Sequence, residues 1–194
     1  MIELLPETNA TRLDLPELFG RTAPLQVDLG CGDGSFVRRL AAQLPQKDFL
    51  GVERLLHRVR AASRKTAGLK NVQVLRSETA FVVRNLLPPN SVEAFYLLFP
   101  DPWPKRRHHR RRLVTEDFLA SIGTALTENG SLIIATDHAE YFARIRELAA
   151  KSKELIPFES TAEHEFPMST FEKRFRDAGI PVQRLELRKT CPVM

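Results

Sequence analysis

Asp101 lies in the stretch of this chain whose residue types and spacing are best suited to chemistry. It stands between Pro100 and Pro102, and it is followed by Trp103, the single tryptophan of the chain, and by Lys105. Proline fixes φ and pushes the residue before it toward extended backbone geometry. The turn should therefore hold a carboxylate, a large aromatic ring and a lysine in a nearly fixed arrangement. Such a turn can place a planar base beside a small reactive group.

A dense cationic run, which we call the arm, follows over residues 105–112. Six of its eight residues are Lys or Arg, and the other two are adjacent histidines. A charge run is most often a solvated surface. This one follows directly on an apolar segment, and its like charges repel one another until an anion binds. We therefore expect Lys105, Arg110 and Arg111 to contact phosphates. The adjacent histidines have no cysteine or carboxylate at ligand spacing nearby, so no metal site is expected.

The overall charge favours the same kind of partner. The chain has 194 residues, with 29 Lys and Arg against 24 Asp and Glu, which gives a formal net charge of +5. This balance favours polyanions, with nucleic acid first and an anionic membrane second. No apolar run approaches the roughly 20 residues of a membrane span. Residues 1–7 lack the basic and apolar segments of a secretory signal. Cys31 and Cys191 are expected as free thiols in a reducing cytoplasm.

A second constellation is the glycine-rich loop at residues 28–34, which reads Asp-Leu-Gly-Cys-Gly-Asp-Gly. Gly30 and Gly32 let the backbone approach a ligand, and the N–H groups of the helix start that follows attract polar groups. Glu53 ends the next apolar run about 20 residues on, where an acidic side chain can bind both ribose hydroxyls. Together these features indicate a cofactor that contains a nucleoside.

The spacing and charge of the loop narrow the choice among nucleoside-containing cofactors. The third glycine comes one residue earlier than in dinucleotide-binding loops, where it makes room for a pyrophosphate. Asp28 and Asp33 add negative charge, which disfavours a pyrophosphate and favours a sulfonium or an α-amino group. S-adenosylmethionine carries both. The alternative is a glycine-rich turn that only packs a helix on a strand.

Two further segments carry candidate residues. Asp137 follows an apolar run and is expected to point into the same crevice as Asp101, or alternatively to cap the following helix. The segment 169–174 resembles a capping box that opens a short helix. Trp103 has two open roles, a wall of the pocket or an anchor in the core. The isolated histidines, which are His57, His138 and His164, are expected at surface or cap positions.

Apolar runs alternate with helical patterns along the chain. Strands are expected at 25–29, 48–53, 71–75, 92–99, 131–136 and 182–188, helices at 35–44, 55–67, 80–87, 118–126 and 139–150, and a turn at 129–130. This alternation predicts an α/β fold with a doubly wound, mostly parallel sheet. Ligands of such sheets bind at the carboxyl ends of the strands. The length predicts one domain over 1–194, with a short N-terminal segment over 1–22 that could be mobile.

Together these segments resemble the bacterial tRNA (guanine-N7-)-methyltransferases, enzymes that methylate the variable-loop guanine at position 46 of tRNA. The resemblance runs from about residue 27 to the C-terminus. The proline-rich turn with its arm is the specific part, because many methyltransferases share the glycine loop. The resemblance implies the Rossmann-like fold of class I S-adenosylmethionine-dependent methyltransferases, with a seven-stranded sheet. It also implies S-adenosyl-L-methionine as the cofactor and tRNA as the partner.

The resemblance also implies where the contacts lie. Cofactor contacts fall on Asp28, Glu53, Glu78 and Asp101, with Gly30 and Gly32 of the loop beside them. Substrate contacts fall on Lys105, Asp137, Ser169, Thr170, Phe171 and Glu172.

The chemistry of guanine suggests how two of these residues act. N7 carries an in-plane lone pair and no proton, so its methylation needs no general base. We expect Asp101 and Asp137 to be catalytic, because a carboxylate can accept hydrogen bonds from guanine N1–H and N2–H₂ and stabilise the positive charge that develops on the purine.

Other classes of function stay open. One is a class I methyltransferase that acts on another RNA, and another is a non-catalytic RNA-binding module in which the glycine loop is only structural. A nicotinamide-dependent reductase on the same kind of sheet is disfavoured by the glycine spacing. In each case we expect a cytoplasmic protein, monomer or homodimer, with no membrane and no metal.

Overall fold

Eight strands form one sheet in the computed structural model, which describes residues 2–3, 11–158 and 167–190. The strands are β1 (Ile2–Glu3), β2 (Leu25–Leu29), β3 (Asp48–Glu53), β4 (Val72–Arg76), β5 (Val92–Leu98), β6 (Leu126–Thr136), β7 (Leu155–Phe158) and β8 (Gln183–Lys189). Their spatial order is β1-β4-β3-β2-β5-β6-β8-β7. The pairs from β1 to β6 are parallel, and β8 runs antiparallel to both β6 and β7.

The order of the strands reverses beside β2. The chain moves outward from β2 through β3 to β4, and then returns to place β5 against the other side of β2. The carboxyl ends of β2 and β5 therefore flank a switch point, where open α/β sheets bind their ligands. The doubly wound, mostly parallel sheet is confirmed, and the two-residue β1 adds an edge strand to the seven expected.

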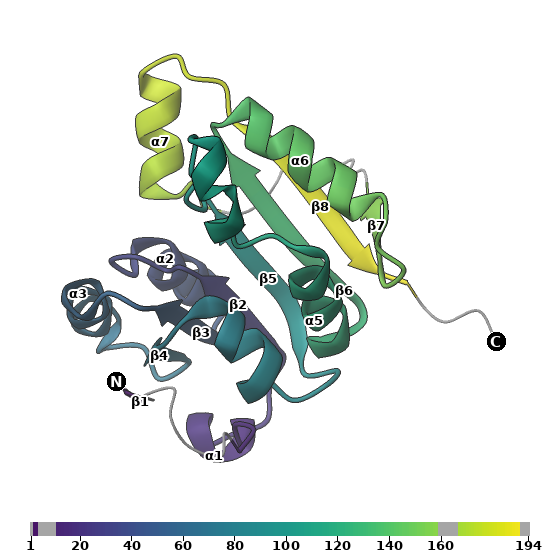
Figure 1. The fold of residues 1–194 in the computed structure, drawn as a ribbon. Coiled ribbons are helices and arrows are strands. Elements are labelled where there is room, and N and C mark those ends of the chain that lie inside the picture. Colours follow the sequence, from purple (N-terminus) through teal and green to yellow (C-terminus); the bar gives the residue numbers. More distant parts are fainter. Residues whose placement is uncertain (1, 4–10, 159–166, 191–194) are drawn as a thin grey trace.

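Helices cover both faces of this sheet (Figure 1). They are α1 (Leu15–Phe19), α2 (Ser35–Gln43), α3 (Leu56–Thr66), α4 (Thr79–Phe81) continued by the π-helix η1 (Val82–Leu86), the 3-10 helix η2 (Arg106–Arg111), α5 (Glu116–Ala125), α6 (Ala139–Ala149) and α7 (Thr170–Asp177). The side chains of α2 and α3 form one apolar cluster with the sheet, and those of η1, α5 and α6 form the other. The core thus has two layers, one on each face.

The predicted turn at 129–130 lies inside a strand rather than before one. Val92 pairs with Leu126 and Ala94 with Ser131, so five residues of β6 pass two of β5. Asn129 takes up the excess with a φ of 61°. A Cβ on Gly130 would lie 2.9 Å from the carbonyl oxygen of Thr127, so the bulge needs glycine there.

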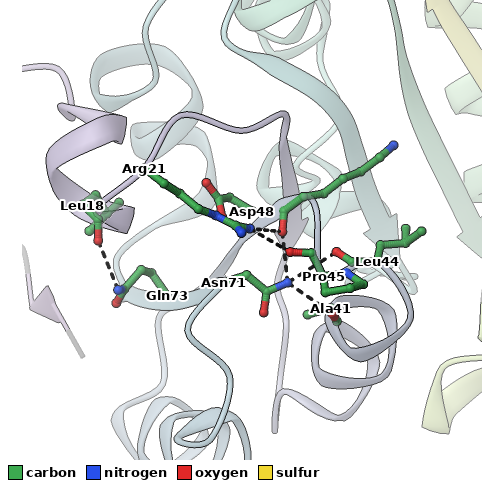
Figure 2. A network of polar contacts seen from close by, with 9 residues as sticks. Leu18, Arg21, Ala41, Leu44, Pro45, Asp48, Asn71 and Gln73 are labelled. Atoms are coloured by element: carbon green, nitrogen blue, oxygen red, sulfur yellow. Dashed lines mark hydrogen bonds and ion pairs between the residues drawn. The ribbon is translucent and has the colours of Figure 1, made fainter.

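Polar contacts tie the N-terminal residues to the amino ends of the strands (Figure 2). Arg21 and the buried Asp48 form an ion pair at 2.6 Å. The Asn71 side chain donates hydrogen bonds to the carbonyl oxygens of Ala41 and Lys47, at 3.1 and 3.0 Å. These contacts fix the edge of the sheet opposite to its carboxyl ends.

Among the helices of the described residues, none has the length and apolar character that a bilayer span requires.

Candidate active site

Two adjoining cavities open at the carboxyl ends of β2, β3 and β5. The first has a volume of about 690 Å³ and is lined by residues after β3, β4 and β5. The second has a volume of about 540 Å³ and is lined by the glycine loop and the start of α7. The two cavities share Gly30, Arg58, Leu98, Phe99 and Asp101. Asp101 therefore lies where the cavities meet.

The glycine loop has a left-handed backbone at each of its three glycines. The φ angles of Gly30, Gly32 and Gly34 are 82°, 57° and 76°. A Cβ on Gly34 would lie 2.8 Å from the Cα of Ala62 in α3, whereas one on Gly30 or Gly32 would meet nothing within 4 Å. The third glycine thus lets α2 and α3 pack closely. The first two leave open space where the loop faces the second cavity.

Asp28, next to the last residue of β2, is a buried carboxylate that lines the second cavity. Among the described residues its Oδ2 atom has no hydrogen-bond partner. Burial raises the pKa of Asp28 to about 7, and the neighbouring charge of Glu53 adds to the rise. A buried carboxylate oxygen without a partner is costly, and a cationic or hydrogen-bond-donating ligand would satisfy it.

Besides Asp101, two acidic side chains line the first cavity, and each has an arginine beside it. The buried Glu53 accepts a hydrogen bond from the N–H of Leu55 at 2.8 Å, and its Oε2 lies 3.9 Å from Arg58. The exposed Glu78 lies 4.0 Å from Arg54. Glu53 is thus fixed by its own backbone at the end of β3. Glu78 lies at the mouth of the cavity with a looser contact.

Asp33 and Cys31 also line the second cavity. Burial on its own raises the pKa of Asp33, but hydrogen bonds from Lys65 and Ser35 outweigh it and leave that pKa below its ordinary range. Burial, with Asp28 and Glu53 nearby, raises the pKa of the free Cys31 thiol. The thiol therefore stays neutral and unreactive at physiological pH.

The proline-rich turn places Asp101 through an unusual backbone. Phe99 and Trp103 have φ angles of 55° and 44°, although each precedes a proline. The extended geometry predicted for both residues is wrong, because the turn bends sharply on both sides of Asp101. A following proline disfavours the right-handed helical region, and a left-handed backbone satisfies that restriction too. The N–H of Phe99 donates to the carbonyl of Ala135 at 2.7 Å, which ties the turn to β6.

The arm folds back on this turn as the helix η2. The guanidinium of Arg111 lies 4.9 Å from the centre of the Trp103 ring, and His108 meets the same ring edge-on at 5.8 Å. The buried Arg112 donates to the carbonyl of Pro102 at 2.8 Å and to both carboxylate oxygens of Glu140. Trp103 is half-buried and lines the first cavity, so it forms a wall there rather than a core anchor.

The three residues predicted to contact phosphates do not all lie at the cavities. Arg111 lines the first cavity. Lys105 and Arg110 are exposed and line neither of the two cavities.

Helix α7 brings its first turn to the second cavity, where Ser169, Thr170 and Phe171 line the wall. Ser169 caps the helix by accepting a hydrogen bond from the N–H of Glu172 at 3.0 Å, as the capping pattern predicts. The Phe99 ring lies 6.3 Å from that of Phe171 and 5.2 Å from that of Phe175. These contacts hold α7 against the turn that carries Asp101.

Glu172 does not line the second cavity, unlike the three residues before it. Its side chain is 3% exposed, and its carboxylate lies 2.9 Å from Arg176 and forms a second ion pair with Arg184 of β8. It lines neither of the two cavities. The same holds for Asp137, which is half-buried just after β6. The alternative role of Asp137 as a helix cap is wrong, because the Nδ1 atom of His138 accepts from the N–H of Tyr141 and caps α6.

Two arginines that line the cavities are not among the residues predicted from the sequence. Arg58 lines both cavities and lies five residues after Glu53, in the first turn of α3. Arg174 lines the second cavity, one turn after Thr170 in α7. Helical spacing from Thr170 was the available signal for Arg174, whereas Arg58 is separated from Glu53 by the end of β3 and had no such signal. His164 and Cys191 lie outside the described residues.

Comparison with known proteins gives consistent matches. A family described as "Putative methyltransferase" matches residues 22–185. The chain is 40% identical over 188 residues to the tRNA (guanine-N(7)-)-methyltransferase of Leifsonia xyli subsp. xyli, covering 91% of this chain and 81% of that protein. It is 39% identical over 166 residues to the protein of the same name from Thermotoga maritima, covering 84% of this chain and 50% of that protein.

Solved structures share the fold at low identity. The aminoglycoside resistance methyltransferase NpmB1 superposes with a TM-score of 0.64 at 19% identity, covering 93% of this chain and 94% of that one. The 16S rRNA methyltransferase KamB superposes with a TM-score of 0.61 at 15% identity, covering 93% of this chain and 95% of that one. The sheet and its flanking helices are thus those of class I methyltransferases.

Proposed function

Because the chain belongs to the family of bacterial tRNA (guanine-N7-)-methyltransferases, we propose that it transfers the methyl group of S-adenosyl-L-methionine to N7 of a guanine in tRNA. The guanine is the one at position 46, in the variable loop. The observation that carries this proposal is the meeting of two cavities at Asp101. A cofactor would extend across both cavities, with its nucleoside in the first and its charged end beside the glycine loop in the second. The base would enter the second cavity from the side of α7, and the arm lies beside the site.

The residues present fit the cofactor. The orphaned Oδ2 of Asp28 suits a group that is cationic and donates hydrogen bonds, and the open space above Gly30 and Gly32 lets the ligand approach the backbone. Glu53 would bind the ribose hydroxyls, and Glu78 would accept from the adenine amino group. When bound, the cofactor supplies an electrophilic methyl carbon next to a sulfonium.

The residues on the α7 side of the second cavity orient the base. Ser169, Thr170 and Phe171 line the wall where a guanine would enter, and Asp101 lies at its boundary with the first cavity. Asp101 accepts hydrogen bonds from the guanine N1–H and N2–H₂ edge, which selects guanine over adenine. The same carboxylate stabilises the positive charge that develops on the purine. N7 has no proton to lose, so orientation and electrostatics account for the catalysis.

Asp137 and Glu172 have weaker support as direct contacts. Asp137 follows β6 at the same edge of the sheet, so a shift of the loop after β6 would bring it to the base. Glu172 acts through α7, which it fixes to β8. Lys105, Arg110 and Arg111 bind phosphates of the tRNA.

Methyl transfer to tRNA tests the proposal. The protein is incubated with S-adenosylmethionine labelled in the methyl group and with tRNA that lacks the modification, and the nucleosides are then separated. We expect label in 7-methylguanosine alone. Label in another nucleoside, or in another RNA but not in tRNA, would favour the alternative substrate. Binding of tRNA with no calorimetric heat from S-adenosylmethionine would favour the RNA-binding module.

The setting of the reaction follows from the substrate. We place the protein in the cytoplasm, where tRNA is processed, and treat residues 1–194 as one domain that acts as a monomer or homodimer. Light scattering of the protein with and without tRNA would decide the oligomeric state.

A further inference from the structure

A third cavity lies next to the first and has no role in the chemistry described above. Its volume is about 300 Å³, and it shares Glu78, Arg111 and Leu113 with the first cavity. The rest of its wall comes from α4, η1, the arm and α5, with Ala80, Arg84, Arg112, Thr115, Phe118 and Ser121. It therefore lies beside the first cavity, on the side of the arm.

The wall of this third cavity carries three guanidinium groups, and they differ in how firmly they are paired. Arg112 is buried and forms a bidentate ion pair with Glu140, so its charge is already compensated. Arg84 lies 3.7 Å from Asp117, and the two side chains are 58% and 84% exposed. A pair this exposed and this loose contributes little. Arg84 is thus available to a stronger anionic partner.

Arg111 is the second available guanidinium. Its contact within the described part of the chain is with the face of Trp103, which leaves the hydrogen-bond donors at its edge uncommitted. Thr115 caps α5 by accepting from the N–H of Phe118, so its own hydroxyl hydrogen is still able to donate. Against these donors stands one lining carboxylate, Glu78, which already lies 4.0 Å from Arg54.

We propose that this third cavity binds one backbone phosphate of the RNA, with Arg84 and Arg111 as its two cationic contacts and the Thr115 hydroxyl as a donor. The inference rests on the proposed function for the identity of the RNA. The guanidinium fork matches the oxygens of a phosphate, and a cavity of this size holds such a group. Because the cavity adjoins the site of methyl transfer, the phosphate belongs to a nucleotide close to the target guanine.

The exposed pair of Arg84 and Asp117 has a matched control in α6. Arg144 and Glu147 form a similar exposed pair at 3.0 Å, and neither residue lines the third cavity. The variants are therefore Arg84→Ala, Arg84→Lys and Asp117→Asn, with Arg144→Ala and Glu147→Gln as controls. Binding of unmodified tRNA is measured without cofactor at several salt concentrations, and binding of S-adenosylmethionine is measured separately.

The phosphate contact predicts opposite effects for the two partners of the pair. Arg84→Ala weakens tRNA binding about 3- to 10-fold and lowers the slope of log Kd against log salt by about one. Arg84→Lys recovers part of the affinity, and Asp117→Asn tightens binding because it removes the competing carboxylate. Affinity for S-adenosylmethionine stays unchanged in all three. Arg144→Ala and Glu147→Gln change tRNA affinity less than twofold.

Two results would overturn the inference. One is an Arg84→Ala protein whose salt slope equals that of Arg144→Ala, and the other is a loss of cofactor affinity in place of tRNA affinity. Neither result depends on methyl transfer. A parent protein that binds tRNA with this salt dependence but methylates no guanine would contradict the proposed function and leave the phosphate site supported.

Discussion

Phe99 and Trp103 share a left-handed backbone, and they stand on either side of Asp101. Residues other than glycine rarely adopt this geometry, and each such residue costs about 1–3 kcal/mol. The turn keeps the strain because Phe99 is tied to β6 and Trp103 is covered by Arg111 and His108. Strain on both sides of one exposed carboxylate indicates that the position of that carboxylate matters to the protein.

The first prediction concerns Asp101. Asp101→Ala should lower single-turnover methyl transfer by at least about 100-fold, because it removes a group that acts on the charge developing in the transition state. Affinity for tRNA should stay within about twofold of the parent, since the arm is unchanged. Glu128→Ala, which removes an exposed carboxylate from the bulge of β6, is the control and should leave both quantities unchanged. A tRNA-binding defect as large as the defect in turnover would show that Asp101 serves binding instead.

The arm should behave in the opposite way. Arg110→Ala combined with Arg111→Ala should raise KM for tRNA about 10-fold or more and leave kcat at saturating tRNA within about twofold, because phosphate contacts position the RNA without touching the reacting atoms. Steady-state kinetics at two salt concentrations separate these quantities. The double variant Lys151→Ala with Lys153→Ala removes two exposed charges after α6 and serves as the control. A fall in kcat with unchanged KM would place the arm in catalysis.

Protonation of Asp28 makes cofactor binding depend on pH. Its pKa is about 7 in the folded protein, since burial and Glu53 oppose its ionisation. A cationic ligand prefers the ionised form, so affinity for S-adenosylmethionine should rise about tenfold between pH 6 and pH 8 and level off above. Calorimetry in two buffers of different ionisation enthalpy should show proton release near pH 6. Asp28→Asn should bind weakly at every pH, and a pH dependence equal to that of the parent would contradict this role.

The same ionisation has the opposite effect on stability without cofactor. The folded carboxyl keeps its proton up to about pH 7, whereas the pKa of an unperturbed Asp is 3.8. Ionisation therefore destabilises the folded protein as the pH rises from about 4 to 7. Asp28→Asn should raise Tm at pH 8 by about 2–8 °C and have little effect at pH 4. A lower Tm at pH 8 would mean that the carboxylate is compensated in the folded state.

Local patterns in the sequence were sufficient for six of the eight strands of the described sheet, all but β1 and β7, and for the glycine-loop half of the site. The run from Asp28 to Gly34 and the acidic end of β3 at Glu53 are short-range signals, because strand ends in a parallel sheet converge at one edge. The cap at Ser169 follows from a spacing of three residues. Each of these predictions needed only neighbours in the sequence and the general rule for α/β sheets.

The rest depended on contacts between distant segments. No local pattern shows that Glu172 meets Arg184 of β8, or that Phe99 packs against Phe175 of α7. The left-handed φ of Trp103 depends on the arm folding back onto its ring. These features are set by tertiary packing, which overrides the local preference of a residue before proline.

The role of Glu172 gives the last prediction. Its buried carboxylate holds α7 to β8 through Arg184, so Glu172→Gln should leave two guanidinium groups without their charge partner and loosen the wall of the second cavity. We expect KM for tRNA to rise several-fold and stability to fall by about 1–3 kcal/mol. Arg184 lines neither cavity described above, so it reports on positioning alone.

Arg184→Ala and the double variant distinguish positioning from direct contact. If Glu172 acts through α7, Arg184→Ala should reproduce most of its kinetic defect, and the double variant should be little worse than either single one, because the two groups act as one unit. If Glu172 instead touches the guanine, Arg184→Ala should keep a near-normal KM and the two defects should add. Denaturant unfolding of the three variants separates the kinetic effect from a loss of folded protein.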